Sequence, residues 1–136
     1  MTVTVVNRLI AATNAHDLDA VVACFHDDYL NETPAHPHRG FRGAEQVRRN
    51  WAQIFAGVPD ISVRVTAWAR HGDEVWSEWR MDGTRPDGAI HAMAGVIIFS
   101  VAKNRISSAR FYLEPVETAT GDVSTAIARA LSEPRT

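Results

Sequence analysis

The sequence predicts an α+β fold in which helices cover one face of an antiparallel sheet. In the first third of the chain, apolar residues recur at the three- and four-residue spacing of helices. From residue 61 onward the apolar period changes to two, which is the period of strands. Because the helices come as one run and the strands as another, the order is that of an α+β domain.

Composition predicts one globular domain. Of the 136 residues, 46% are hydrophobic and 22% are charged, which is typical of a folded domain and not of a disordered chain. One domain is expected at this length. We place it over 1–136, with a core at about 7–117 and a C-terminal tail at 118–136.

Charge and cysteine content exclude several classes of partner. Lys and Arg number 14 and Asp and Glu 16, for a net charge of −2. A nucleic-acid or anionic-membrane partner would require a basic surplus, so neither is expected. The single cysteine, Cys24, excludes an intramolecular disulfide and a CxxC motif. No apolar run approaches the ~20 residues of a membrane span, and no targeting segment is visible, so we expect a cytoplasmic protein.

Three helices are predicted before residue 57. Apolar residues between Val6 and Thr13 share one helical face. Asp17 can cap a second helix whose inner face ends at Phe25. A third helix, from about 44 to 56, has an apolar face formed by Val47, Trp51, Ile54 and Phe55.

Extended segments and loops complete the pattern. A short extended piece at 29–33 precedes a loop at 34–43, which is rich in proline and glycine. Four strands joined by hairpins then cover 61–70, 74–81, 90–101 and a last segment that includes 109–114. The tail can add a helix between Asp122 and Leu131. A strongly curved sheet wrapped around helices forms a cone, and such a cone usually encloses a pocket.

Alternation gives the sheet an apolar inner face and a charged outer face. Strand 90–101 is apolar on both sides, so its facing stays open from periodicity alone. The outer stripe mixes charges and aromatic residues: Arg64, Trp68, Arg70, Trp76, Glu78, Arg80, Arg110, Tyr112 and Glu114. Because exposed tryptophan in a patch is costly, we predict that this stripe forms a two-fold homodimer interface.

The chain resembles the SnoaL-like branch of the nuclear transport factor two superfamily. The segments that carry the resemblance are DDYLNETPAHPHRGFRGAEQVRRNWAQIF, EVWSEWRMDGTRPDG, AGVIIFSVAKNRI and SARFYLEPVE. The resemblance implies a single SnoaL-like domain, in which a mainly antiparallel sheet forms a cone around three helices and encloses a hydrophobic pocket. The superfamily includes isomerases, cyclases, epoxide hydrolases and proteins without enzymatic activity, so the fold does not name the reaction.

Two catalytic patterns of the superfamily are incomplete here. Limonene epoxide hydrolases hold a water with a Tyr-x-Asn pair, which Tyr29 and Asn31 match. Their Arg-x-Asp positions fall on Trp79 and Met81, and their last-strand Asp falls on Phe111. The acid and the base of that mechanism are absent, so such a hydrolase is not expected. The last-strand carboxylate of SnoaL-like polyketide cyclases also falls near Phe111.

The candidate catalytic residues are His91, Tyr29 and Asn31. The resemblance implies that His91 faces inward, where its unperturbed pKa of about 6.5 suits proton transfer. The alternative is a neutral histidine that is hydrogen-bonded at the pocket mouth. Tyr29 and Asn31 can hold an oxygen that gains or loses charge, or can instead bind the neighbouring loop. The candidate substrate contacts, which are alternatively plain core residues, are Trp51, Ser77, Trp79, Met81, Met93 and Phe111.

These residues predict acid/base chemistry without a cofactor. The expected substrate is small and hydrophobic, of polyketide or terpenoid type, and the enzyme would be a cyclase or isomerase. The alternative is a non-catalytic ligand-binding or accessory protein with the same fold. His36 and His38 flank a proline, and His26 is a third histidine, but no carboxylate pattern accompanies them, so no metal site is predicted.

Overall fold

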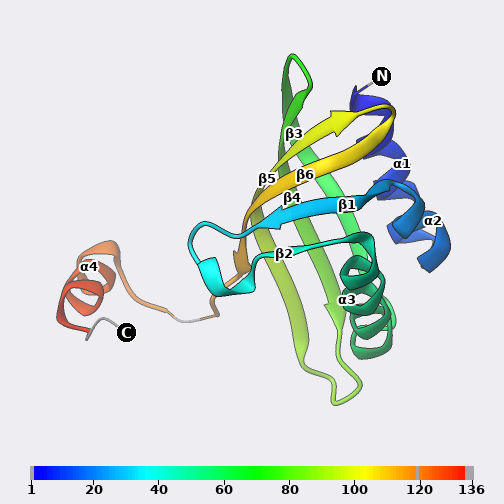
Figure 1. Ribbon diagram of the computed structural model, residues 1–136. Helices are drawn as coiled ribbons and strands as arrows, with labels where there is room; N and C mark the ends of the chain where they lie inside the picture. Colours follow the sequence, from blue (N-terminus) through cyan, green and yellow to red (C-terminus); the bar gives the residue numbers. More distant parts are fainter. Residues whose placement is uncertain (1, 119, 134–136) are drawn as a thin grey trace.

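A computed structural model describes residues 2–118 and 120–133 (Figure 1). Its elements, in chain order, are α1 (Thr2–Asn14), α2 (Leu18–Ala23), β1 (Phe25–Glu32), the short 3₁₀ helix η1 (Pro37–Arg39), β2 (Phe41–Arg42), α3 (Ala44–Gly57), β3 (Ser62–His71), β4 (Glu74–Thr84), β5 (Ile90–Ala102), β6 (Arg105–Pro115) and α4 (Val123–Ser132). No helix among these residues is long and apolar enough to cross a membrane.

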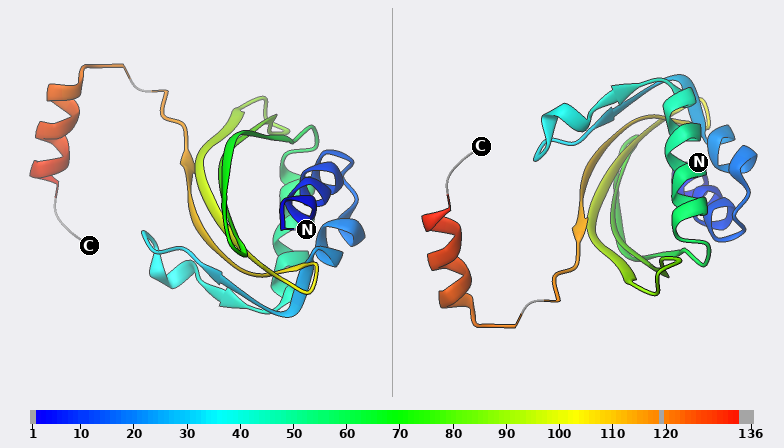
Figure 2. Two further views of the ribbon diagram at one scale, coloured as in Figure 1. Left: turned by 90° about the horizontal axis from the view of Figure 1, so that it is seen from above. Right: turned by 90° about the horizontal axis from the view of Figure 1, so that it is seen from below.

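The sheet has six strands in the order β2-β1-β6-β5-β4-β3. All neighbours are antiparallel except β1 and β6, which pair in parallel. The sheet is strongly curved, and α1, α2 and α3 lie on its concave side, whereas α4 lies beyond the end of β6 on the convex side (Figure 2). The α+β cone that the sequence predicts is therefore confirmed.

The hydrophobic core fills the space between the concave face and the first three helices. Its fully buried side chains include Val5 and Val21 from the helices, Ile61 just before β3, and Ile97 and Phe99 from β5. The predicted cap of α2 forms, since Asp17 accepts a hydrogen bond from the Ala20 amide at 3.1 Å. Asp122 caps α4 in the same way through the amide of Thr125 at 2.8 Å.

The second helix is shorter than its apolar period predicts. It ends at Ala23, and Phe25 begins β1 instead of closing the helical face, so the expectation that Phe25 is helical is wrong. The cause is long-range pairing, because the Ile106 amide donates to the Cys24 carbonyl at 2.7 Å and Phe25 lies opposite Ile106 in β6. Pairing with β6 also makes β1 longer than the predicted extended piece at 29–33.

Strand β3 contains a β-bulge that the alternating pattern does not reveal. Val65 lies opposite Trp79, but Ala67 lies opposite Glu78, so Thr66 is the extra residue. Because side chains alternate between the two faces of a sheet, one inserted residue exchanges the faces of everything that follows in the strand.

The bulge corrects two members of the predicted outer stripe. Trp68 lies opposite the buried Ser77, and Arg70 lies opposite the buried Val75. Both residues are therefore on the inner side of the sheet, where Trp68 lines a groove with Val3 and Val6 of α1 and is 57% exposed. Their assignment to the outer face is wrong.

Strand β5 has the facing that the resemblance implies. His91, Met93 and Gly95 lie opposite Gly83, Met81 and Trp79 of β4. Gly95 has a φ of +153°, and a Cβ built on it would collide with the backbone oxygen of Tyr112 in β6. Only glycine fits at this point, where β5 and β6 approach closely.

Candidate ligand pocket

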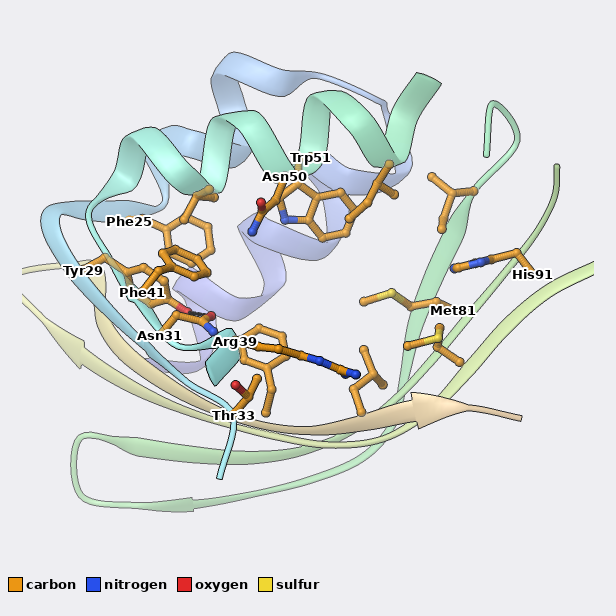
Figure 3. A pocket seen from close by; sticks show the side chains of 16 residues that line it. Phe25, Tyr29, Asn31, Thr33, Arg39, Phe41, Asn50, Trp51, Met81 and His91 are labelled. Atoms are coloured by element: carbon orange, nitrogen blue, oxygen red, sulfur yellow. Dashed lines mark hydrogen bonds between the residues drawn. The ribbon is translucent and has the colours of Figure 1, made fainter. Parts of the chain in front are cut away.

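A cavity of about 310 Å³ lies between the concave face of the sheet, α3 and the β1–β2 hairpin (Figure 3). Helix α3 contributes Val47, Asn50, Trp51 and Ile54. The hairpin contributes Phe25, Tyr29, Asn31, Thr33, Arg39 and Phe41. Strands β4, β5 and β6 and the residue just before β3 contribute Ile61, Met81, His91, Met93, Phe111 and Leu113. No carboxylate is among these lining residues.

Tyr29 and Asn31 form a buried hydrogen-bonded pair. They are two residues apart in β1 and therefore share a face, and they are only 1% and 7% exposed. The Tyr29 hydroxyl donates to Oδ1 of Asn31 at 2.7 Å. Burial raises the pKa of the Tyr29 phenol far above its ordinary value, so the hydroxyl stays a donor.

That bond determines what Asn31 can offer to a ligand. Its amide oxygen is occupied by Tyr29, whereas its Nδ2 group has no hydrogen-bond partner among the described residues and is not sealed off from the cavity. Asn31 can therefore donate a hydrogen bond to an oxygen in the pocket, and Tyr29 acts as the positioning residue behind it.

His91 faces the pocket from the other side. It lies near the start of β5, is half-buried, and points into the cavity from the side opposite Tyr29 and Asn31 (Figure 3). Within the described part of the chain, no hydrogen bond to its ring is present. The imidazole is therefore available to a ligand.

Four of the predicted substrate contacts line the cavity, and two do not. Trp51, Met81, Met93 and Phe111 are lining residues, and Met93 and Phe111 are also partly buried against the core. Ser77 and Trp79 lie outside the lining and are buried, at 1% and 3% exposure.

The polar atoms of these two residues are already paired. The Trp79 indole N–H donates to the Ser77 hydroxyl at 2.7 Å, and that hydroxyl donates to the Ile97 carbonyl at 2.7 Å. A substrate role for Ser77 and Trp79 stays a prediction from the sequence, and we leave both out of the proposed site.

Sequence reasoning missed three polar lining residues: Thr33, Arg39 and Asn50. Asn50 had a usable signal, because it lies three residues after the inward Val47 and therefore near the same helical face. Thr33 and Arg39 are in the loop after β1, where neither period applies.

His36 holds the β1–β2 hairpin to β6, and His26 of β1 binds elsewhere. Nε2 of His36 lies 2.7 Å from Oε1 of Glu114 in β6. The Thr33 hydroxyl donates to the His36 carbonyl at 2.9 Å. His26 binds the Ala102 carbonyl at 2.6 Å, away from His36. Among the described residues, no group of three or more His, Cys, Asp or Glu side chains could hold a metal.

A curved sheet that encloses an apolar cavity against three helices defines the nuclear transport factor two-like class of α+β proteins. The chain belongs to the SnoaL-like domain family, whose sequence model matches residues 6–109. No curated protein has a sequence that matches this chain significantly.

Solved structures share the fold at low sequence identity. A putative SnoaL-like polyketide cyclase from Jannaschia sp. CCS1 is 21% identical, with a TM-score of 0.69 over 98% of this chain and 93% of that chain. A Mycobacterium tuberculosis protein in complex with estradiol-17β-hemisuccinate is 20% identical, with a TM-score of 0.71 over 82% and 92%. An epoxide hydrolase of the limonene type from M. tuberculosis is 19% identical, with a TM-score of 0.71 over 83% and 82%. At these identities the similarity establishes the fold alone.

Proposed function

We propose that the pocket binds a small hydrophobic molecule and catalyses a proton transfer on it without a cofactor. The observation that carries this proposal is an apolar cavity into which a histidine and an oriented amide face from opposite sides. His91 is the only lining residue whose ordinary pKa is near neutrality. A general acid or base is most effective when its pKa is near the working pH.

In the proposed mechanism, His91 removes a proton from carbon next to a carbonyl group, or returns one. Negative charge then develops on the carbonyl oxygen, and the Asn31 Nδ2 group donates a hydrogen bond to it. Tyr29 keeps the amide in that orientation. The apolar body of the substrate packs against Trp51 and Met81. Chemistry of this kind serves cyclisation or isomerisation of polyketide- or terpenoid-like substrates.

Two similar structures support a substrate of this class. The Jannaschia protein is described as a putative polyketide cyclase, and the M. tuberculosis protein binds a steroid derivative, which is a flat apolar polycycle. By contrast, Met81 and Phe111 occupy the positions at which limonene epoxide hydrolases carry carboxylates, so we do not propose epoxide hydrolysis.

A non-catalytic ligand-binding protein is the second candidate. The observation that favours it is the lack of any carboxylate among the lining residues. The two candidates share the same ligand class and differ only in the role of His91.

The test is a binding screen with aromatic polyketide fragments, followed by turnover measurements on every ligand found. A positioned general base contributes typically 10²–10⁴-fold in rate, so His91→Ala should lower kcat by about 100-fold or more and change binding little. The matched control is His71→Ala at the exposed end of β3, outside the pocket lining, which should keep wild-type activity. Equal turnover by wild type and His91→Ala would refute the catalytic role. Binding without turnover would favour the second candidate.

We also propose that a cytoplasmic homodimer forms through the convex face of the sheet. On that face Trp76 is 45% exposed and Tyr112 is 42% exposed, beside the Arg110–Glu74 ion pair. Light scattering at micromolar concentration should give twice the chain mass of 15.0 kDa. A monomer mass would refute this interface.

A further inference from the structure

The pocket carries one positive charge and no negative one. Arg39 is a lining residue, and it is the only charged side chain in a lining that is otherwise apolar or neutral. We infer that the ligand carries an acidic group, such as a carboxylate, and that Arg39 binds this group. This inference rests on the proposed function, because it names the chemical class of ligand for the same pocket.

Arg39 has donors that the protein itself does not use. Within residues 2–118 and 120–133 its guanidinium makes no hydrogen bond and no ion pair. By contrast, two arginines that follow it in the sequence have partners within the protein: Arg42 donates to the Asp28 carbonyl at 3.2 Å, and Arg48 pairs with Asp19 at 2.8 Å. A guanidinium offers five N–H donors in a planar fork that fits a carboxylate with two parallel hydrogen bonds.

The backbone under Arg39 is held in place. The Arg39 amide donates to the His36 carbonyl at 2.9 Å, and Pro37 restricts φ at the start of η1. His36 is in turn fixed to β6 through Glu114 and to Thr33, the residue after β1. Because His36 anchors the start of η1, and β2 follows Arg39 after one residue and pairs with β1, less conformational freedom is lost when Arg39 binds a ligand.

The direction of the side chain places the acidic group. In Figure 3, Arg39 extends along the pocket from the side of Thr33 toward the side of Met81 and His91. The acidic group is therefore expected between the hairpin and the end of the pocket that His91 occupies. The apolar part of the ligand is left to the walls formed by Trp51 and the sheet.

The experiment compares two fluorescent probes that share an apolar body. The anion is 1-anilinonaphthalene-8-sulfonate, and the neutral probe is N-phenyl-1-naphthylamine, which lacks the sulfonate. Wild type should bind the anion more tightly. Arg39→Gln should weaken anion binding by roughly tenfold and leave binding of the neutral probe unchanged. Added salt should weaken binding of the anion only.

Two further variants make the result specific. Arg49→Gln removes an arginine on the solvent side of α3, outside the lining, and should bind both probes like wild type. Arg39→Lys keeps the charge without the fork and should fall between wild type and Arg39→Gln. Competition by 2-naphthoic acid, but not by 2-naphthamide, should depend on Arg39 in the same way and extends the result to carboxylates.

The outcomes separate this inference from the proposed function. If Arg39→Gln binds the anion as tightly as wild type while the neutral probe still binds, the inference is wrong and the pocket stands. If Arg49→Gln loses as much anion affinity as Arg39→Gln, the loss comes from the lower net charge of the protein and not from a contact with Arg39, and the inference is again wrong. If neither probe binds to wild type, both the inference and the proposed pocket function fail.

Discussion

Replacing Tyr29 by Phe isolates one hydrogen bond on which the proposed site depends. The ring of Tyr29 packs edge-on against Phe25 at 4.7 Å and against Phe41 at 6.0 Å between ring centroids, and phenylalanine keeps both contacts. Only the hydroxyl that donates to Asn31 Oδ1 at 2.7 Å is removed. The variant therefore leaves a nearly buried amide oxygen without its donor.

The expected loss follows from that burial. An intramolecular hydrogen bond contributes about 1 kcal/mol net, and an unsatisfied buried acceptor costs about 1–3 kcal/mol. Since Asn31 retains a small exposure of 7%, we expect Tyr29→Phe to lower the free energy of unfolding by about 1–2 kcal/mol. Asn31→Ala removes the acceptor, so adding Tyr29→Phe to it should cost much less.

The assay is a double-mutant cycle by urea unfolding of wild type, both single variants and the double variant. A coupling energy of about 1 kcal/mol between Tyr29 and Asn31 would support the bond, and the same pair should be coupled in ligand affinity. Strictly additive changes would refute the conclusion that Tyr29 orients the amide, and with it the proposed role of Asn31 as a donor.

Two further predictions concern stability. Because burial raises the pKa of Tyr29, the unfolded chain loses the phenol proton at a lower pH than the folded chain does. The free energy of unfolding is therefore unaffected by this group below pH ~10 and falls above that pH by about 1.4 kcal/mol per pH unit. Tyr29→Phe should lack this part of the pH dependence when alkaline unfolding is measured. Gly95→Ala should destabilise the protein by about 2–4 kcal/mol, because alanine is strained at a φ of +153° and its Cβ meets the Tyr112 carbonyl. Gly57→Ala is the control, since its Cβ meets nothing within 4 Å at the end of α3, and it should be neutral or slightly stabilising; equal losses in both glycine variants would contradict the packing argument.

Local patterns predicted much of this fold because the helices and β4 follow their own periodicity. The inward residues of β4, from Val75 to Met81, alternate without interruption and are all buried. The pattern failed in β3, where Thr66 is inserted without any change in residue type that marks a bulge. It also failed at Phe25, because β1 owes its length to a strand at the other end of the chain.

The pocket residues likewise include some that the sequence predicted and some that it did not. Tyr29, Asn31 and His91 were found because strand alternation and the resemblance fix which side chains face inward. Arg39 was not found, because a loop residue has no period and its position depends on the His36–Glu114 contact across the sheet. Ser77 has the inward facing that alternation predicts, but facing alone does not separate core from cavity.

The parallel pairing of β1 with β6 has a consequence for the order of folding. In the described sheet, the hairpin that carries Tyr29, Asn31 and Arg39 is joined to the other strands only through β6, which is synthesised after all of them. During synthesis, β3, β4 and β5 can form their local hairpins early, whereas β1 has to wait for a partner far away in sequence. Until then β1 presents an unpaired edge that other chains can capture. The binding wall is thus the last part of the molecule to assemble.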